Sequence, residues 1–188
     1  MTVPFFFGYG SLVNTATHGY GGAQPARLKG WRRAWVHTGL REVAFLSAVP
    51  CESSEIDGLI AEVPGADWAA LDEREFAYER LPATNAVQHG LETSPEISVY
   101  TVAPERRNGV TRQHPVLLSY LDVVLQGYLQ VFGEAGAREF IASTDGWDAP
   151  ILNDRAAPRY PRHQLLDSGE RALFDRLIAE TGAQILTG

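Results

Sequence analysis

The apolar residues of the first hundred positions gather in short runs that end at Gly, Pro, Ser or Asp, a pattern typical of β-strands. Five strands are predicted, at residues 3–8, 26–38, 42–50, 55–64 and 96–104. One helix is predicted between them, at residues 67–80, with Asp67 as its N-cap and Pro82 marking its end. The N-terminal half is therefore expected to form mainly a β-sheet.

From residue 114 onward the apolar positions recur at helical spacing instead. Two helices are predicted at residues 114–133 and 134–144, broken at Gly133, and a third at residues 168–181, from a Ser168 cap to Gly182. Strands followed by helices, without regular β-α-β alternation, predict an α+β fold: a mixed, largely antiparallel β-sheet or barrel with helices packed around it. Because no linker, repeat or low-complexity tract divides the chain, residues 1–188 are expected to form a single domain.

The composition restricts the partners of the chain. Sixteen Lys and Arg residues against 23 Asp and Glu residues give a formal net charge of −7, and no basic cluster predicts a nucleic-acid surface. The apolar N-terminal run is too short to span a membrane, so a cytoplasmic protein without a membrane partner is expected. One apolar stripe is either core or the contact of a homodimer; it comprises Val116, Leu117, Tyr120, Leu121 and Val124.

Cysteine and histidine offer no metal or nucleophile motif. The single cysteine, Cys51, cannot form an intrachain disulfide and is interpreted as a loop thiol. The five histidines form neither an H-E-x-x-H motif nor a Cys/His cluster, so no metal site is predicted.

One carboxylate of the predicted helix stands on its apolar face. At about 100° per residue, that face carries Trp68, Leu71, Glu75 and Tyr78. Arg74 points away from it and is expected to be a solvated charge. A carboxylate that loses hydration acquires a raised pKa and can both take and return a proton near neutral pH. Glu75 is therefore such a group, or it pairs with an arginine such as Arg32 or Arg41, or its side chain extends toward water past the edge of the apolar face.

The strand at residues 3–8 runs into the sequence GYGS, residues 8–11. Gly8 and Gly10 lack side chains that would obstruct a ligand, and successive N–H groups in such a turn can bind an anion. The sequence matches neither G-x-G-x-x-G nor a P-loop, so nucleotide binding is not predicted. A plain turn and a ligand-binding turn both remain open from these residues alone.

The two features together resemble the γ-glutamylcyclotransferase superfamily, which includes ChaC-like and AIG2-like proteins. The resemblance rests on FFFGYGSL at residues 5–12 and on GLIAEVPGADWAALDEREFAYE at residues 58–79, with its L-D-x-x-E core. The spelling FGYGSL is similar to that of the ChaC-type, glutathione-degrading branch. The resemblance to the superfamily covers the first hundred residues well and the helical half only weakly.

The resemblance implies an enzyme that releases 5-oxoproline from a γ-glutamyl amine or peptide, such as glutathione, without a metal or cofactor. The glutamate that closes L-D-x-x-E, Glu75, corresponds to the catalytic acid and base. The substrate-binding residues that the resemblance implies are Phe6, Phe7, Gly8, Tyr9, Gly10, Ser11 and Tyr120. Glu75 is thus indicated both by the helix pattern and by the family motif.

Two other functions stay open at this stage. A non-catalytic module on the same scaffold would hold a small acidic ligand in the glycine turn, and a related lyase or transferase would act on a γ-glutamylated metabolite. Arg155, Arg159 and Tyr160 either reach over the pocket mouth to meet a substrate carboxylate or pair internally.

Overall fold

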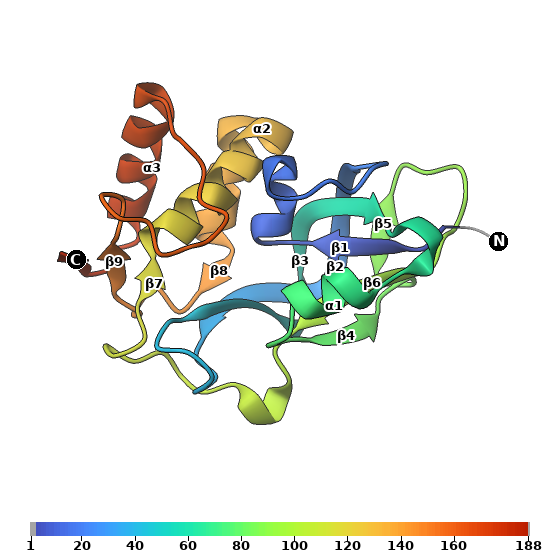
Figure 1. Ribbon diagram of the computed structural model, residues 1–188, viewed down its shortest axis with the longest axis horizontal. Coiled ribbons are helices and arrows are strands. Elements are labelled where there is room, and N and C mark those ends of the chain that lie inside the picture. The colour runs from blue at the N-terminus through green and yellow to red at the C-terminus, as the bar shows by residue number, and fades with distance from the viewer. Residues whose placement is uncertain (1–2, 188) are drawn as a thin grey trace.

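The computed structural model describes residues 3–187 and has an α+β fold (Figure 1). Its larger sheet has seven strands: β1 (Phe5–Gly8), β2 (Gln24–Val36), β3 (Phe45–Glu62), β4 (Glu79–Pro82), β5 (Val87–His89), β6 (Ile97–Thr101) and β8 (Thr144–Asp145). A smaller sheet contains β7 (Val116–Leu117), β9 (Ile151–Asn153) and β10 (Ile185–Thr187). The helices are α1 (Ala69–Arg74), α2 (Leu118–Ala142) and α3 (Ser168–Glu180).

The larger sheet is mixed and mainly antiparallel, as the sequence predicted. Its order is β4-β6-β1-β3-β2-β5, with β8 beside β2. Only the β1–β6 and β2–β8 pairs in it are parallel. Because β4 and β5 end the path without pairing to each other, the sheet is curled but open, and the predicted alternative of a barrel is wrong.

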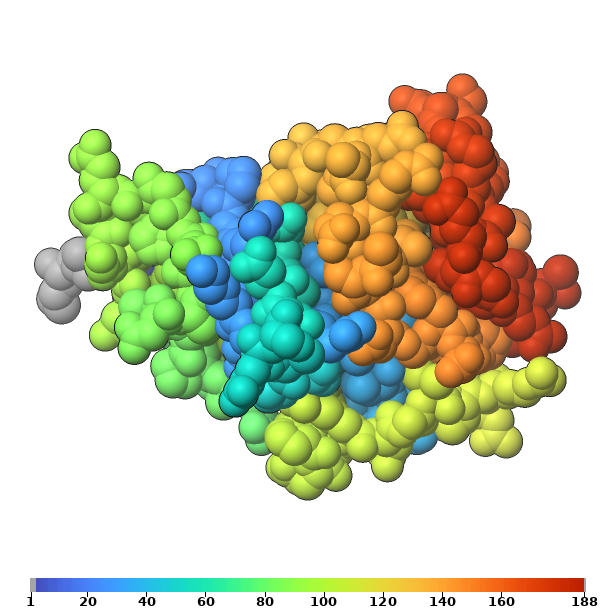
Figure 2. Space-filling view, turned by 180° about the vertical axis from the view of Figure 1, so that it is seen from behind, coloured from blue at the N-terminus to red at the C-terminus, as the bar shows by residue number. Residues whose placement is uncertain are grey.

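The three phenylalanines of β1 divide between two hydrophobic clusters because side chains alternate across a strand. Phe5 and Phe7 lie in the main core beneath α2 and α3, whereas Phe6 packs in a second cluster with Leu71 of α1. Seen from behind, α2 and α3 cover one side of the molecule and the N-terminal strands occupy the other (Figure 2). The stripe on and before α2 is core: Val116, Leu121 and Val124 are fully buried.

Two predictions about β3 differ from the structure. The strands predicted at residues 42–50 and 55–64 are one strand, β3, whose pairing with β2 shifts register between Lys29 and Trp31, opposite the predicted break. Cys51 lies in this irregular stretch of β3 and not in a loop.

The break predicted at Gly133 is confirmed. Gly133 has a non-helical φ of 69° and ψ of −172°, so α2 consists of two helical segments joined across a kink at this residue.

Helix α1 is much shorter than predicted. It ends at Arg74, and Pro82 lies in β4, because residues 79–82 pair with β6 and satisfy their backbone hydrogen bonds in the sheet. Asp67 still contacts the start of the helix, accepting a hydrogen bond from the Ala69 N–H at 3.1 Å. The cap predicted for α3 was off by one residue: Asp167, not Ser168, forms a capping box with Glu170.

In the described part of the chain, no helix is both long and apolar enough to cross a membrane. Among residues 3–187, the acidic, histidine and cysteine side chains form no group of three or more placed to hold a metal ion.

Candidate active site

The chain turns sharply after β1, at residues 8–11. Gly10 precedes a 3₁₀ turn at Ser11–Val13, closed by a 3.0 Å hydrogen bond from the Val13 N–H to the Gly10 carbonyl. A Cβ on Gly10 would lie 2.7 Å from the Oη of Tyr120, so only glycine allows this close approach. Within residues 3–187, the N–H groups of Gly10 and Ser11 donate to no backbone carbonyl. The Ser11 N–H faces the Tyr120 hydroxyl, since it acts on the pKa of that phenol as a backbone hydrogen-bond donor. Both N–H groups therefore lie at the turn beside Tyr120.

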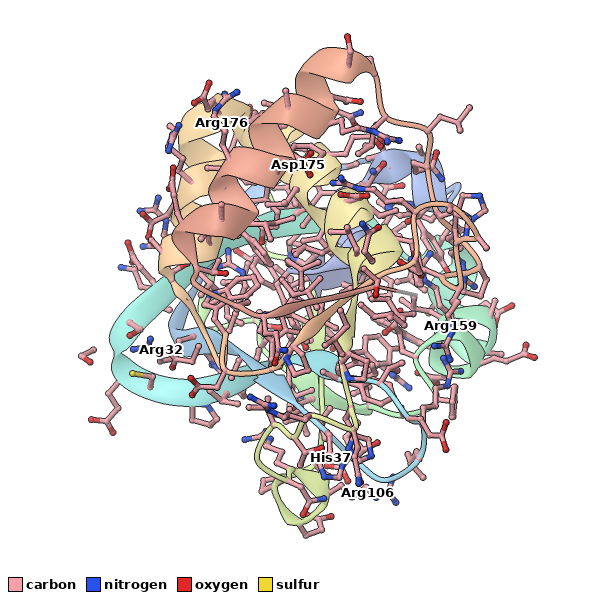
Figure 3. All side chains as sticks on the ribbon, turned by 90° about the vertical axis from the view of Figure 1, so that its left-hand side faces the viewer. Arg32, His37, Arg106, Arg159, Asp175 and Arg176 are labelled. Atoms are coloured by element: carbon pink, nitrogen blue, oxygen red, sulfur yellow. The ribbon has the colours of Figure 1, made fainter. Side chains whose placement is uncertain are left out.

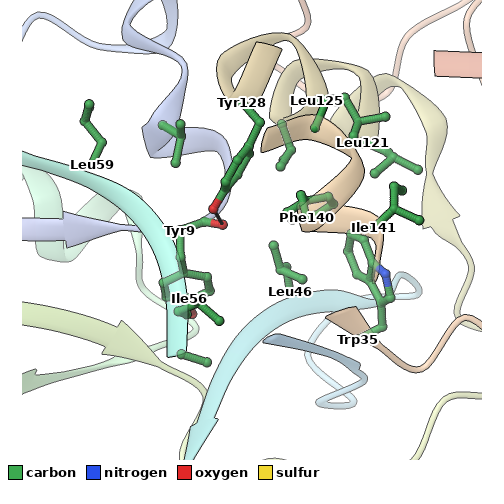
Figure 4. Close-up of a cluster of buried hydrophobic side chains, with 14 of the residues drawn as sticks. Tyr9, Trp35, Leu46, Ile56, Leu59, Leu121, Leu125, Tyr128, Phe140 and Ile141 are labelled. Atoms are coloured by element: carbon green, nitrogen blue, oxygen red, sulfur yellow. Dashed lines mark hydrogen bonds between the residues drawn. The ribbon is translucent and has the colours of Figure 1, made fainter. Parts of the chain in front are cut away.

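A buried arginine–tyrosine pair holds the turn from the side of α2. The Oη of Tyr128 lies 3.0 Å from the carbonyl oxygen of Tyr9 (Figure 4), and Arg33 donates to that Oη from Nε at 3.2 Å and Nη2 at 2.9 Å. The C=O and N–H of a trans peptide point in opposite directions. Because the carbonyl of Tyr9 is held toward Tyr128, the N–H of Gly10 points away from it.

Glu75 follows α1 directly and lies outside the helix, contrary to the prediction. Its backbone N–H still bonds the Leu71 carbonyl at 2.9 Å, but its φ of −99° and ψ of 28° end the helix. The helical-face argument nevertheless placed Glu75 correctly, because this last bond keeps it in phase with Leu71. Its side chain is only 15% exposed.

Burial raises the pKa of the Glu75 carboxyl above its ordinary value. The charges of Arg74 and Arg162 and a hydrogen bond from Arg74 oppose this effect, but desolvation is the largest contribution. A carboxyl with a raised pKa changes its protonation state closer to neutral pH than an exposed glutamate does. Glu75 can therefore both accept and return a proton.

Arg74 is buried and joins Glu75 to the glycine turn, although the sequence predicted a solvated charge. Its Nε lies 3.2 Å from Oε1 of Glu75, and its side chain is 8% exposed. Its two Nη atoms donate to the Thr17 carbonyl at 3.0 Å, the Thr17 Oγ1 at 3.1 Å and the Ser11 Oγ at 3.4 Å. Neither arginine considered as a partner forms an ion pair with Glu75. Arg32 (Figure 3) pairs with Asp145, whereas Arg41 lies over the ring of Phe76 and lines a cavity together with Glu75.

Three tyrosines surround the carboxyl of Glu75. Burial raises the phenol pKa of Tyr9, Tyr78 and Tyr120, and the charge of Glu75 adds to this effect in all three. Their hydroxyls are therefore protonated at neutral pH. Tyr9 donates to the Tyr100 carbonyl at 2.7 Å and Tyr78 to the Leu46 carbonyl at 3.0 Å. These bonds fix two of the three hydroxyls beside Glu75.

Two adjoining cavities open on Glu75. The smaller, of about 30 Å³, is lined by the glycine turn together with Phe7 and Tyr100, and the larger, of about 160 Å³, by residues of β3, the segment after α1 and the loop around Tyr160. Five residues line both cavities: Ser11, Leu46, Glu75, Tyr78 and Tyr120. These shared residues lie where the two cavities meet. A ligand that extended through both cavities would therefore have Glu75 beside its middle.

Most of the predicted site residues meet at these cavities. The smaller cavity is lined by Glu75 and by Phe7, Gly8, Tyr9, Gly10, Ser11 and Tyr120. Phe6 does not line either cavity, because strand alternation points its side chain into the second cluster, where it packs edge-on against Tyr20 at 5.2 Å. Because consecutive side chains of a strand lie on opposite faces, the position of Phe6 in β1 already indicated that it and Phe7 point in opposite directions.

The sequence left open whether residues of the C-terminal loop reach the pocket or pair internally, and the structure shows both. Tyr160 lines the larger cavity, whereas Arg155 forms internal ion pairs with Asp122 and Asp175. Neither cavity is lined by Arg159. Sequence reasoning missed Arg162, which lines the larger cavity two residues beyond Tyr160. It stands in a loop without periodicity, so no pattern pointed to it.

Comparison with known proteins identifies one matching family. The model of the family described as gamma-glutamyl cyclotransferase, AIG2-like, matches residues 6–118, a segment that contains the glycine turn, α1 and Glu75. No curated protein sequence matches the chain.

Solved structures share the fold at low sequence identity. One named gamma-glutamyl cyclotransferase superimposes with a TM-score of 0.60 at 13% identity, covering 93% of this chain and 99% of its own. An uncharacterized protein from Homo sapiens gives a TM-score of 0.59 at 14% identity, with the same coverage. YkqA from Bacillus subtilis gives 0.57 at 17% identity, and the match covers 78% of this chain and 57% of YkqA. At these identities the likeness establishes the fold.

Proposed function

Because this chain belongs to the gamma-glutamyl cyclotransferase, AIG2-like family, we propose that it releases 5-oxoproline from a γ-glutamyl compound, with Glu75 as general acid and base. Family membership supports a cyclotransferase-type reaction. The observation that carries the specific proposal is the buried Glu75 carboxyl, which lines the same small cavity as Gly10 and Ser11, whose N–H groups donate to no backbone carbonyl.

The reaction begins with the α-amine of the substrate's own glutamyl group. This amine is an ammonium at neutral pH and must lose a proton before it can attack. Glu75, in its ionised form, takes that proton, and the amine nitrogen then bonds to the γ-carbonyl carbon while the carbonyl π electrons move to oxygen. The smaller cavity holds the glutamyl chain folded, and this proximity supplies much of the rate.

The oxyanion that forms needs donors fixed in advance. The N–H groups of Gly10 and Ser11 are suited to this role, because the backbone of the turn is held by Tyr128 and cannot reorient at little cost. When the oxyanion collapses, the carbonyl re-forms and the bond to the leaving nitrogen breaks. Glu75 gives its proton to that nitrogen and then takes the second proton of the ring nitrogen, which passes to the departing amine, so the products are 5-oxoproline and the amine in its ammonium form.

The proposal is tested by incubating the purified protein with γ-glutamyl-alanine, glutathione and a γ-glutamyl amine and measuring 5-oxoproline by mass spectrometry. Release of 5-oxoproline together with one equivalent of amine is expected from at least one compound. Binding without any release would instead identify a non-catalytic module. Release of a γ-glutamyl product other than 5-oxoproline would identify a related transferase.

Replacing Gly10 with Ala is expected to lower kcat/KM for 5-oxoproline release by about 100-fold, because a displacement of roughly 1 Å at a reacting group has that effect. The added Cβ would meet the Tyr120 Oη at 2.7 Å, so either the turn or the tyrosine must move. Gly19→Ala is the control, since its Cβ would have no neighbour within 4 Å. Equal kcat/KM for the two variants would contradict the assignment of the turn to the substrate.

A further inference from the structure

The larger cavity contains two arginines that the proposed chemistry does not use. Arg41 and Arg162 both line it, and both are exposed at its mouth. In residues 3–187 neither has an Asp or Glu oxygen within ion-pair distance. Arg74 is different, because its guanidinium is already bonded to Glu75, Thr17 and Ser11. Arg41 and Arg162 are therefore the cations of this cavity that are available to a ligand.

The surroundings of the two arginines direct them toward the same space. The guanidinium of Arg41 lies 4.6 Å from the centre of the Phe76 ring, a cation–π contact that holds it at the cavity rim. Arg162 lines the same cavity as Glu75, and its positive charge lowers the pKa of that carboxyl. The one acidic side chain lining the cavity is Glu75, against Arg41, Arg74 and Arg162. The larger cavity is thus electropositive.

The division into two cavities separates the two halves of a γ-glutamyl compound. The smaller one, beside the glycine turn, suits the glutamyl group that reacts. The scissile bond lies beside Glu75, at the boundary, so the departing half must extend into the larger cavity. The alkyl group of a simple amine offers the arginines no negative charge, whereas a carboxylate can receive two parallel hydrogen bonds from a guanidinium.

We propose that Arg41 and Arg162 bind a carboxylate on the departing half of the substrate, so that the enzyme acts on γ-glutamyl amino acids and peptides in preference to γ-glutamyl amines that lack a carboxylate. This inference rests on the proposed function and specifies its substrate class. The alternative is that the two arginines bind the α-carboxylate of the glutamyl group, which every γ-glutamyl substrate carries.

The test compares γ-glutamyl-alanine with γ-glutamyl-ethylamine, which differ only in the carboxylate of the departing half. Wild-type kcat/KM is expected to be about 10- to 100-fold higher for γ-glutamyl-alanine, the range for hydrogen bonds to a charged group. Arg41→Gln should lower this ratio by reducing kcat/KM for γ-glutamyl-alanine alone. Arg162→Gln should reduce kcat/KM for both compounds, because its charge also acts on the pKa of Glu75, but more for γ-glutamyl-alanine, so the ratio should fall here too. Arg176→Gln makes the same charge change on exposed α3, away from the cavities, and should leave the ratio unaltered.

Several outcomes would overturn the inference while leaving the proposed function intact. Equal kcat/KM for the two compounds in the wild-type protein would do so, and so would an equal loss on both compounds in the arginine variants. If neither these two compounds nor glutathione yields 5-oxoproline, the proposed function fails. Calorimetric binding of the two compounds to the Glu75→Gln protein then decides the subsite. Tighter binding of γ-glutamyl-alanine would then support it, and equal binding would reject it.

Discussion

Glu75→Gln is expected to lower kcat for 5-oxoproline release by about 100- to 10,000-fold, the usual contribution of a positioned general acid or base. The amide keeps the size and most of the contacts of the carboxyl but cannot carry a proton between the substrate amine and the leaving nitrogen. KM should change little, because the substrate is held by the turn and the larger cavity. Steady-state measurement of both constants separates these effects.

Glu73→Gln is the matched control, since Glu73 stands in α1, two residues before Glu75, and is exposed. It should keep the parent kcat. A Glu75→Gln protein that is folded and still forms 5-oxoproline at the parent rate would remove Glu75 from the mechanism.

The Glu75→Gln substitution is not expected to lower the free energy of unfolding at neutral pH. A raised carboxyl pKa means that the folded state binds the proton more tightly than the unfolded chain. The free energy of unfolding of the parent therefore decreases as pH rises from the unfolded pKa through the raised folded pKa. The variant lacks this decrease and should be at least as stable as the parent at pH 7, as urea unfolding at pH 4 and pH 7 can show.

Arg33→Ala is expected to lower the free energy of unfolding by roughly 3 kcal/mol or more, because it removes a large buried side chain and its hydrogen bonds together. Arg33 is 1% exposed and donates to Tyr128, to the Ser143 Oγ at 2.8 Å and to the Asp57 carbonyl at 2.9 Å. Urea unfolding provides the measurement. Arg33→Met, which keeps much of the volume, separates lost packing from lost hydrogen bonds.

The neighbouring residue supplies the control. Arg32→Ala removes an arginine whose side chain is 35% exposed and whose ion pair with Asp145 is at the surface, so a change below about 1 kcal/mol is expected. If Arg33→Ala were no more destabilising than Arg32→Ala, the buried arginine would not support the turn in the way described.

The main strands could be predicted from the sequence because each is an apolar run ended by turn residues. The end of α1 could not, since residues 75–80 have helical periodicity, and only the pairing of β4 with β6 draws residues 79 and 80 into the sheet. The two predicted segments of β3 both pair with β2, one on each side of the register shift. Both differences arise from the pairing of strands that are far apart in the sequence, which a local sequence pattern cannot predict.

The site was predictable in the two places where its residues carry a local signal. Glycines after a strand indicated the turn, and a carboxylate in phase with apolar residues indicated Glu75. Arg74 was wrongly predicted to be solvated, because helical periodicity shows only how side chains are arranged around their own helix. Its partners, Thr17 and Ser11, come from the segment after β1. Arg41 and Arg162 stand in irregular segments and reach the cavity only through the fold.

The most direct test of the account is the pKa of Glu75, measured by ¹³C NMR titration of side-chain carboxyls, with the Glu75→Gln protein used to assign the signal. The expected result is a pKa above that of an ordinary glutamate, matching the pH below which kcat/KM for 5-oxoproline release falls as the base becomes protonated. A pKa at or below the ordinary value, or an acid limb that stays unchanged in the Glu75→Gln protein, would contradict the assignment of Glu75 as the group that carries the proton.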